Sequence, residues 1–160
     1  TSVAIPLIFR HQLPQGVNHF RVGETLYFGR DLFNDTLLEG MEEGIFELFA
    51  EVIEVHEKPV VPVGELGEDP TGETYSIDPE DYQKESERAI LDIGLLDIDP
   101  KYLIPHDDNI EVVGGSSDMI VLDLGDNPSQ IKVGDKIPFH MKYMGALQLL
   151  NSDYIEKQII

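Results

Sequence analysis

His106, Asp107 and Asp108 are adjacent, and they offer nitrogen and oxygen atoms of the kinds that metal ions bind in proteins. A helical zinc site would need a second histidine at the i+4 position, which is Ile110 in this chain. Proline, aspartate and asparagine side by side, as in residues 104–109, are also ordinary turn chemistry. We therefore favour a turn here and expect no metal site.

Other residue types that carry out catalysis are present without a diagnostic spacing. Asp92, Asp97 and Asp99 could act as paired acid and base, but 31 acidic residues in a chain of 160 produce such neighbours by chance. Ser116 and Ser117 lack the Gly-x-Ser-x-Gly context of a hydrolase nucleophile. The other histidines are scattered and are interpreted as surface or satisfied core residues: His11, His19, His56 and His140.

The charge balance excludes one large class of partners. Lys and Arg total 11 against 31 Asp and Glu, so the formal net charge is −20 and a nucleic acid would be repelled. The absence of cysteine excludes disulfides, thiolate metal sites and a cysteine nucleophile. The apolar run at residues 3–9 is interrupted by Pro6 and is too short for a signal sequence or a membrane span. We expect a soluble, cytoplasmic protein with one main core and no membrane partner.

The N-terminal part contains apolar segments separated by glycine and proline. Residues 3–9 suit a buried strand or the start of a short helix. Residues 20–29 have the pattern of a barrel strand with glycine near each end, whose end carries a ligand loop. Glycines limit any helix in residues 32–44 to about one or two turns, so this segment is predicted to be a connector.

From residue 45 onward, apolar residues alternate with a period of two. Residues 45–55 therefore predict a long, mostly buried strand. Residues 64–88 are rich in glycine, proline and acids, which predicts a solvated loop with a short helix near residues 79–87. Turn signals separate four further predicted strands, at residues 89–93, 110–113, 119–124 and 137–142. Several short strands at this spacing predict a mainly β fold, either a barrel or a sandwich.

Four segments spread over nearly the whole chain share an ordered pattern with a known family. The first is QLPQGVNHFRVGE at residues 12–24, and the second is EVIEVHEKP at residues 51–59, followed by GELG at residues 64–67. The third is GGSSD at residues 114–118, followed by VLDL, and the fourth is Tyr143 followed by SDYIEK at residues 152–157. In this order the segments resemble the alanine/ornithine racemase family of pyridoxal-phosphate enzymes, and its ornithine-type branch in particular.

The resemblance implies an architecture. Members carry the cofactor on a lysine near the start of a (β/α)8 barrel, and a following β domain from the partner subunit of a homodimer closes the site. Residues 1–42 would then form the end of the cofactor-binding barrel, and residues 43–160 a β-barrel-like C-terminal domain. The cofactor lysine is expected outside this chain, because no lysine here lies in the matching context.

The resemblance also assigns cofactor contacts. Arg21 matches the arginine that contacts the pyridine nitrogen of pyridoxal 5'-phosphate. A guanidinium does not give up its proton, so it would leave that nitrogen unprotonated and limit electron withdrawal, which suits racemisation over transamination. Val22, Gly23 and Glu24 match the backbone stretch whose N–H groups approach the phosphate, and Tyr143 matches a tyrosine on that phosphate. The alternatives are a salt bridge for Arg21, a plain turn for Gly23 and an aromatic residue at a strand edge for Tyr143.

The substrate side of the site follows from the same resemblance. Ser117 and Asp118 match the pair at the substrate entrance, where a carboxylate would suit a cationic side chain such as that of ornithine or lysine. Leu95 occupies the position of the tyrosine that serves as base on the second face. Leucine cannot move a proton, and racemisation needs a base on each face. Either another residue, such as Asp97 or Tyr154, takes this role, or the protein has departed from racemase chemistry.

The sequence therefore predicts the C-terminal region of a pyridoxal-phosphate racemase acting on a free amino acid of the alanine, ornithine or lysine type. This region would complete the cofactor and substrate pocket without being catalytic alone. The alternative is an acidic β-barrel binding or structural module without a cofactor, like a translation-factor domain.

Overall fold

The structure is a computed structural model that describes residues 4–64, 67–68, 72 and 78–159. The chain divides into two units, Thr1–Glu47 and Leu48–Ile160, and each is described here by itself. Residue 3 of the first predicted segment and residues 65–66 of the GELG motif lie outside the described residues, as does part of the predicted loop at residues 64–88.

The first unit is built from short elements. They are the helices α1 (Ile5–Phe9) and α2 (Glu24–Phe28) and the antiparallel strands β1 (Arg30–Asp31) and β2 (Thr36–Leu37). The helix α1 is one of the two structures predicted for this segment. The turn between β1 and β2 forms around the buried Asp31, whose carboxylate accepts hydrogen bonds from the Phe33 N–H (2.9 Å) and the Asn34 side chain (2.8 Å). These bonds hold the pKa of Asp31 below its ordinary value.

The predicted barrel strand at residues 20–29 is wrong, because α2 occupies its second half. Gly29 ends this helix in the left-handed conformation with a φ of 66°, and its N–H donates to the Thr25 carbonyl at 2.9 Å. A Cβ at Gly29 would lie 2.7 Å from the Glu42 carbonyl oxygen, so both the turn and its packing require glycine. Over so few residues the periodicities of a helix and a strand cannot be separated.

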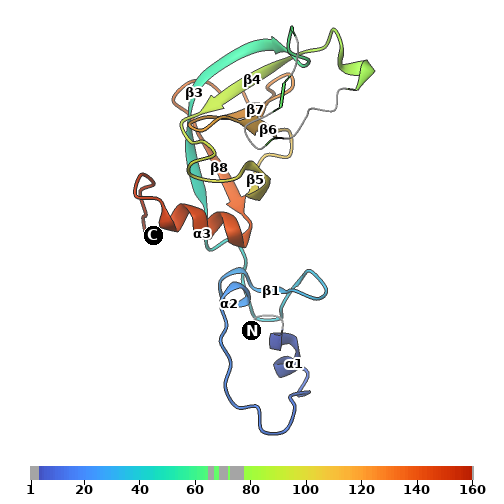
Figure 1. Ribbon diagram of the computed structural model, residues 1–160, viewed down its shortest axis with the longest axis vertical. Coiled ribbons are helices and arrows are strands. Elements are labelled where there is room, and N and C mark those ends of the chain that lie inside the picture. Colours follow the sequence, from blue (N-terminus) through green and yellow to red (C-terminus); the bar gives the residue numbers. More distant parts are fainter. Residues whose placement is uncertain (1–3, 65–66, 69–71, 73–77, 160) are drawn as a thin grey trace. The chain divides into compact units, whose positions relative to one another are not determined.

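In the second unit, six strands form one antiparallel sheet in the order β5-β8-β3-β4-β7-β6 (Figure 1). The two edge strands, β5 and β6, also contact each other, which makes the sheet barrel-like. The strands are β3 (Leu48–Pro59), β4 (Glu85–Leu91), β5 (Leu103–Pro105), β6 (Glu111–Gly115), β7 (Ile120–Asp123) and β8 (Lys136–Met141). This arrangement confirms the predicted mainly β, barrel-like fold.

The strand β3 alternates as predicted, but only one of its faces is covered. Leu48, Ala50 and Val52 are buried, whereas Phe49 and Ile53 remain 55% and 45% exposed. An antiparallel sheet commonly leaves one face in solvent. The prediction that this strand is mostly buried is therefore wrong.

The other predicted elements differ from the structure mainly at their ends. β6, β7 and β8 cover three of the four further predicted strands, and the fourth corresponds to the second half of β4. Because β4 already begins at Glu85, the predicted helix near residues 79–87 is reduced to the 3-10 turn η2 (Pro79–Asp81). The Asp78 carboxylate caps this turn by accepting a hydrogen bond from the Glu80 N–H at 3.0 Å. The short strand β5 and the helix α3 (Tyr143–Asn151) were not predicted.

The helix α3 packs closely against the 3-10 turn η3 (Pro100–Tyr102). A Cβ at Gly145 would lie 2.8 Å from the Tyr102 Cβ and 2.9 Å from the Ile98 Cδ1, so this approach requires glycine. Ala146 and Leu149 are buried on the same helix. The C-terminal helix is thereby joined to the loop that leads into β5.

The core of the second unit is formed mainly by aliphatic side chains from the sheet and its connecting loops. Its most deeply buried large residues are Val52, Leu91, Ile98, Ile120, Leu122, Leu124 and Phe139. In the described part of the chain, no helix has the length and hydrophobicity needed to cross a membrane.

Candidate functional site

Two loops of the second unit pair through their backbones. The Leu95 N–H donates to the Ser116 carbonyl at 2.9 Å, and the Leu96 N–H donates to the Ser117 carbonyl at 3.0 Å. The structure therefore brings the position of the expected second base, Leu95, next to the predicted substrate pair of Ser117 and Asp118. These residues are more than 20 positions apart in the sequence, so the fold itself assembles this part of the candidate site.

Gly94 makes the pairing of these loops possible. A Cβ at this buried position would lie 2.3 Å from the Ser117 carbonyl oxygen and 2.5 Å from the Asp118 Cα. Both are backbone atoms and cannot rotate away. Only glycine allows residues 94–97 to approach the Ser117–Asp118 segment this closely.

The Ser117 hydroxyl donates a hydrogen bond of 2.6 Å to the Asp118 carboxylate. Both side chains are exposed. The hydroxyl orients one carboxylate oxygen, while the negative charge stays at the surface. The pair can therefore attract an ammonium group from solution.

A small polar network holds the loop that carries Leu95. The Asp97 carboxylate accepts hydrogen bonds from the Gly94 N–H (3.3 Å) and the Ser152 hydroxyl (3.2 Å). The Ser152 hydroxyl in turn accepts a hydrogen bond from the Tyr154 N–H at 3.2 Å. Asp97 thus positions this loop, and the Tyr154 side chain is 94% exposed. Asp97 and Tyr154, the two residues considered for the role of second base, are therefore linked through Ser152.

Leu95 is half-buried and Leu96 is 78% exposed. Because both side chains are aliphatic, neither brings a titratable group to the paired loops. Tyr143, predicted to contact the phosphate, is the first residue of α3 and is half-buried. The alternative that placed Tyr143 at a strand edge is incorrect, because β8 ends at Met141.

In the first unit, the predicted cofactor contacts form one continuous segment at the start of α2. Arg21 is exposed, Val22 is half-buried, and Gly23 directly precedes the helix. The Gly23 carbonyl accepts hydrogen bonds from the Leu26 N–H (2.9 Å) and the Tyr27 N–H (3.3 Å). Glu24 is the first residue of the helix. These residues therefore form the turn that leads into α2, and none of them lies in a strand.

The lysines of this chain do not resemble a cofactor lysine, which needs a desolvated pocket to become nucleophilic. Lys58 pairs with Glu54 at 2.8 Å and Lys84 with Asp81 at 2.9 Å, and the Asp81 carboxylate raises the pKa of Lys84. All the lysines lie in the described part of the chain, and all are exposed: Lys58, Lys84, Lys101, Lys132, Lys136, Lys142 and Lys157.

The acidic residue next to His106 serves the turn, as predicted. The Asp107 carboxylate accepts hydrogen bonds from the Asn109 N–H (2.9 Å), the Asn109 side-chain amide (2.7 Å) and the Ser129 hydroxyl (2.5 Å). These donors hold the pKa of Asp107 below its ordinary value, with the Ser129 hydroxyl as the largest cause.

We expect Ser129→Ala to raise the pKa of Asp107 towards that of a free aspartate. Because its pKa is lowered in the folded state, the ionised carboxylate stabilises the fold at pH values above the unfolded-state pKa of about 3.9. That stabilisation is lost as the pH falls through the folded-state pKa. A carbon-detected NMR titration of the side-chain carboxyl measures the change. Ser117→Ala, which removes the hydroxyl donor of a different carboxylate, is the control and should leave Asp107 unchanged. An Asp107 titration unaltered by Ser129→Ala would contradict the assigned bond.

A separate groove of about 640 Å³ lies in the second unit. Its lining includes Val55, Glu87, Asn127 and Lys132. None of the predicted site residues lines it.

Comparisons with known proteins find that this chain is similar to parts of two amino-acid racemases. No protein-family model matches the chain. It is 39% identical over 159 residues to an ornithine racemase from Acetoanaerobium sticklandii, which covers 99% of this chain and 44% of the relative. It is 40% identical over 146 residues to a lysine racemase from Thermotoga maritima, which covers 91% of this chain and 40% of the relative. The chain thus spans less than half the length of these relatives. The predicted resemblance is confirmed: along nearly its whole length the chain is similar to a part of an ornithine racemase and of a lysine racemase, which is consistent with an alanine racemase-like family.

Proposed function

We propose that this chain is the C-terminal region of a pyridoxal-phosphate racemase that interconverts the enantiomers of a free dibasic amino acid. In this proposal it completes the cofactor and substrate pocket of a homodimer and leaves the cofactor lysine to another part of the protein. The observation that carries the proposal is the similarity to ornithine racemase along 99% of the chain. The pairing of the Leu95 loop with Ser117 and Asp118 supports it, because residues assigned to one site do lie together.

The proposed substrate follows from charge. The two relatives are named for ornithine and lysine, and both of these amino acids carry an ammonium group at the end of the side chain. Asp118 presents an exposed carboxylate that Ser117 orients at 2.6 Å. We assign this carboxylate to the substrate's distal ammonium group, since an opposite charge at the entrance favours a cationic over a neutral amino acid.

The first unit offers hydrogen-bond donors that suit the pyridine nitrogen and the phosphate of the cofactor. When bound, pyridoxal phosphate makes the α-proton of an amino acid removable by withdrawing electrons from it. Arg21 is exposed and offers guanidinium N–H groups to the pyridine nitrogen, which accepts a hydrogen bond. Val22, Gly23 and Glu24 would approach the phosphate through their backbone. The phenol group of Tyr143 is likewise assigned to a cofactor phosphate. The exposed lysines do not fit the covalent link.

The second base is assigned to a titratable group near the loop that carries Leu95. Asp97 lies in this loop and already accepts two hydrogen bonds, whereas the Tyr154 side chain is exposed. Both remain candidates. The Ser152 hydroxyl, which bonds to the Asp97 carboxylate and to the Tyr154 N–H, would hold either residue close to the loop.

The test uses the complete protein that contains this chain, supplied with pyridoxal phosphate. We expect it to racemise ornithine or lysine, as measured by chiral chromatography. Arg21→Glu should shift the products from racemisation towards transamination, because a carboxylic acid can protonate the pyridine nitrogen and strengthen electron withdrawal. Lys101→Glu reverses the same charge at an exposed residue outside the predicted site and should leave the product ratio unchanged.

The 160-residue chain alone is the second control. Borohydride reduction with pyridoxal phosphate should label no single lysine stoichiometrically, and no racemisation should occur. A complete protein without cofactor-dependent turnover would instead favour the acidic β-barrel binding module. An Arg21→Glu enzyme with unchanged rate and products would refute the role of Arg21.

A further inference from the structure

Two histidines that are far apart in the sequence lie on neighbouring strands of the second unit. In the pairing of β5 with β8, Ile104 is opposite His140. His106 directly follows β5, and its N–H donates to the Pro138 carbonyl at 3.1 Å. Because side chains alternate along a strand, His106 and His140 share a face and Phe139 points to the other one. Phe139 is fully buried in the core, so the two histidines lie on the solvent side.

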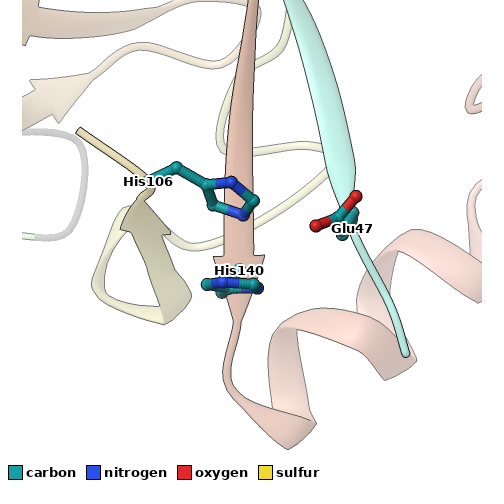
Figure 2. A group of neighbouring side chains, drawn as sticks. All are labelled: Glu47, His106 and His140. Carbon is teal, nitrogen blue, oxygen red and sulfur yellow. The ribbon is translucent and has the colours of Figure 1, made fainter. Parts of the chain in front are cut away.

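The two imidazole rings are in contact. Their centroids are 3.9 Å apart with an angle of 34° between the ring planes, and Figure 2 shows the rings one above the other. A ring nitrogen of His106 lies within 4.8 Å of one of His140. The strand register fixes both backbones, so a ligand that joins the rings has to order only two side chains.

Imidazole nitrogen is a preferred ligand for nickel, copper and zinc ions, whereas magnesium and calcium prefer oxygen. Asp107, next to His106, is engaged by Asn109 and Ser129 and stays in its turn. Glu47, also labelled in Figure 2, directly precedes β3 and closes the first unit. A site within the second unit therefore uses only the two imidazoles as protein ligands, and water molecules would complete the coordination. The net charge of −20 raises the local concentration of any divalent cation.

We propose that His106 and His140 together bind one late first-row divalent metal ion, Ni²⁺, Cu²⁺ or Zn²⁺, on the exposed face of the β5–β8 pair. The site shares no residue with the paired loops at Leu95 and Ser117. It does not depend on the racemase assignment.

Isothermal titration of the 160-residue chain with Zn²⁺, in excess Mg²⁺ to occupy carboxylates, tests the proposal. We expect one ion per chain, and each of His106→Ala and His140→Ala should weaken its binding by at least about tenfold. His56→Ala is the matched control, because His56 is an exposed histidine on β3 of the same unit. The His56→Ala chain should bind Zn²⁺ with the affinity of the unmodified chain. Equal affinity in all three variants, or an equal loss in His56→Ala, would overturn the proposal.

A second measurement remains decisive if a variant folds poorly. Substoichiometric Ni²⁺ should broaden the ring-proton NMR signals of His106 and His140 in the unmodified chain before those of the other histidines. The signals for comparison are those of His11, His19 and His56. Uniform broadening of all five histidines would show unspecific binding and refute the paired site.

Discussion

The Gly94→Ala variant is expected to lose about 3 kcal/mol of the free energy of unfolding. The added Cβ would lie 2.3 Å from the Ser117 carbonyl oxygen and 2.4 Å from the Asp118 carbonyl carbon. Because these are backbone atoms, the loop must move as a whole. That movement would break the hydrogen bonds from Leu95 and Leu96 to the facing segment. Urea unfolding of the 160-residue chain measures the loss.

In the complete protein, the same substitution should also lower kcat/KM for racemisation by about a hundredfold, since small displacements of positioning groups have effects of that size. Gly67→Ala is the matched control. Gly67 has no atom within 4 Å of an added Cβ and does not have a left-handed φ, so alanine fits there. If both variants unfolded at the same urea concentration, the close approach of the two loops would be wrong.

The strands could be predicted from the sequence because period-two alternation is a local signal. The predicted strand at residues 119–124 contains β7 (Ile120–Asp123), and the one at residues 137–142 largely coincides with β8 (Lys136–Met141). Alternation does not reveal which face is covered, however. Phe49 and Ile53 are as apolar as the buried residues of β3, and only the packing of the sheet leaves them exposed.

The segments that were predicted wrongly, or missed, depend on contacts beyond the local pattern. The helix α2 (Glu24–Phe28) has only five residues and ends at the left-handed Gly29, whose packing against Glu42 has no signature in residues 20–29. The helix α3 (Tyr143–Asn151) requires the close approach of Gly145 to Tyr102. Both glycines have their role only in the folded chain.

The candidate site was predicted by resemblance rather than by spacing. Ser117, Asp118 and Leu95 were named together because they match a family pattern, and hydrogen bonds between their loops bring them together. Asp97, first considered as a catalytic acid, holds the loop through Gly94 and Ser152. A search at helical spacing could not connect His106 with His140, because two strands bring these residues together.

The charged pair inside the β4–β7 ladder provides the other large expected effect. Arg88 and Asp123 are directly opposite each other in the register, and the Arg88 Nη2 lies 3.2 Å from the Asp123 carboxylate. Their side chains are only 10% and 19% exposed. Asp123 also accepts hydrogen bonds from the Ser86 hydroxyl and from the Gly125 N–H (2.8 Å). One carboxylate therefore serves three donors at the edge of the core.

We expect Asp123→Ala to lower the free energy of unfolding by about 3–5 kcal/mol, because it leaves the buried Arg88 guanidinium without its counter-charge. The Arg88 Nε is already buried without a hydrogen-bond partner among the described residues, and the bond from Nη2 to the Val60 carbonyl is long, at 3.5 Å, so it compensates the charge only weakly. Asp126→Ala removes an exposed acid from the same region and should change stability by less than about 0.5 kcal/mol. The double variant Arg88→Met/Asp123→Leu removes both charges and should be more stable than Asp123→Ala, since the main cost is the unpaired charge. Urea unfolding of the four proteins decides the matter: a double variant no more stable than Asp123→Ala would mean that the carboxylate acts through its bonds to Ser86 and Gly125 rather than through Arg88.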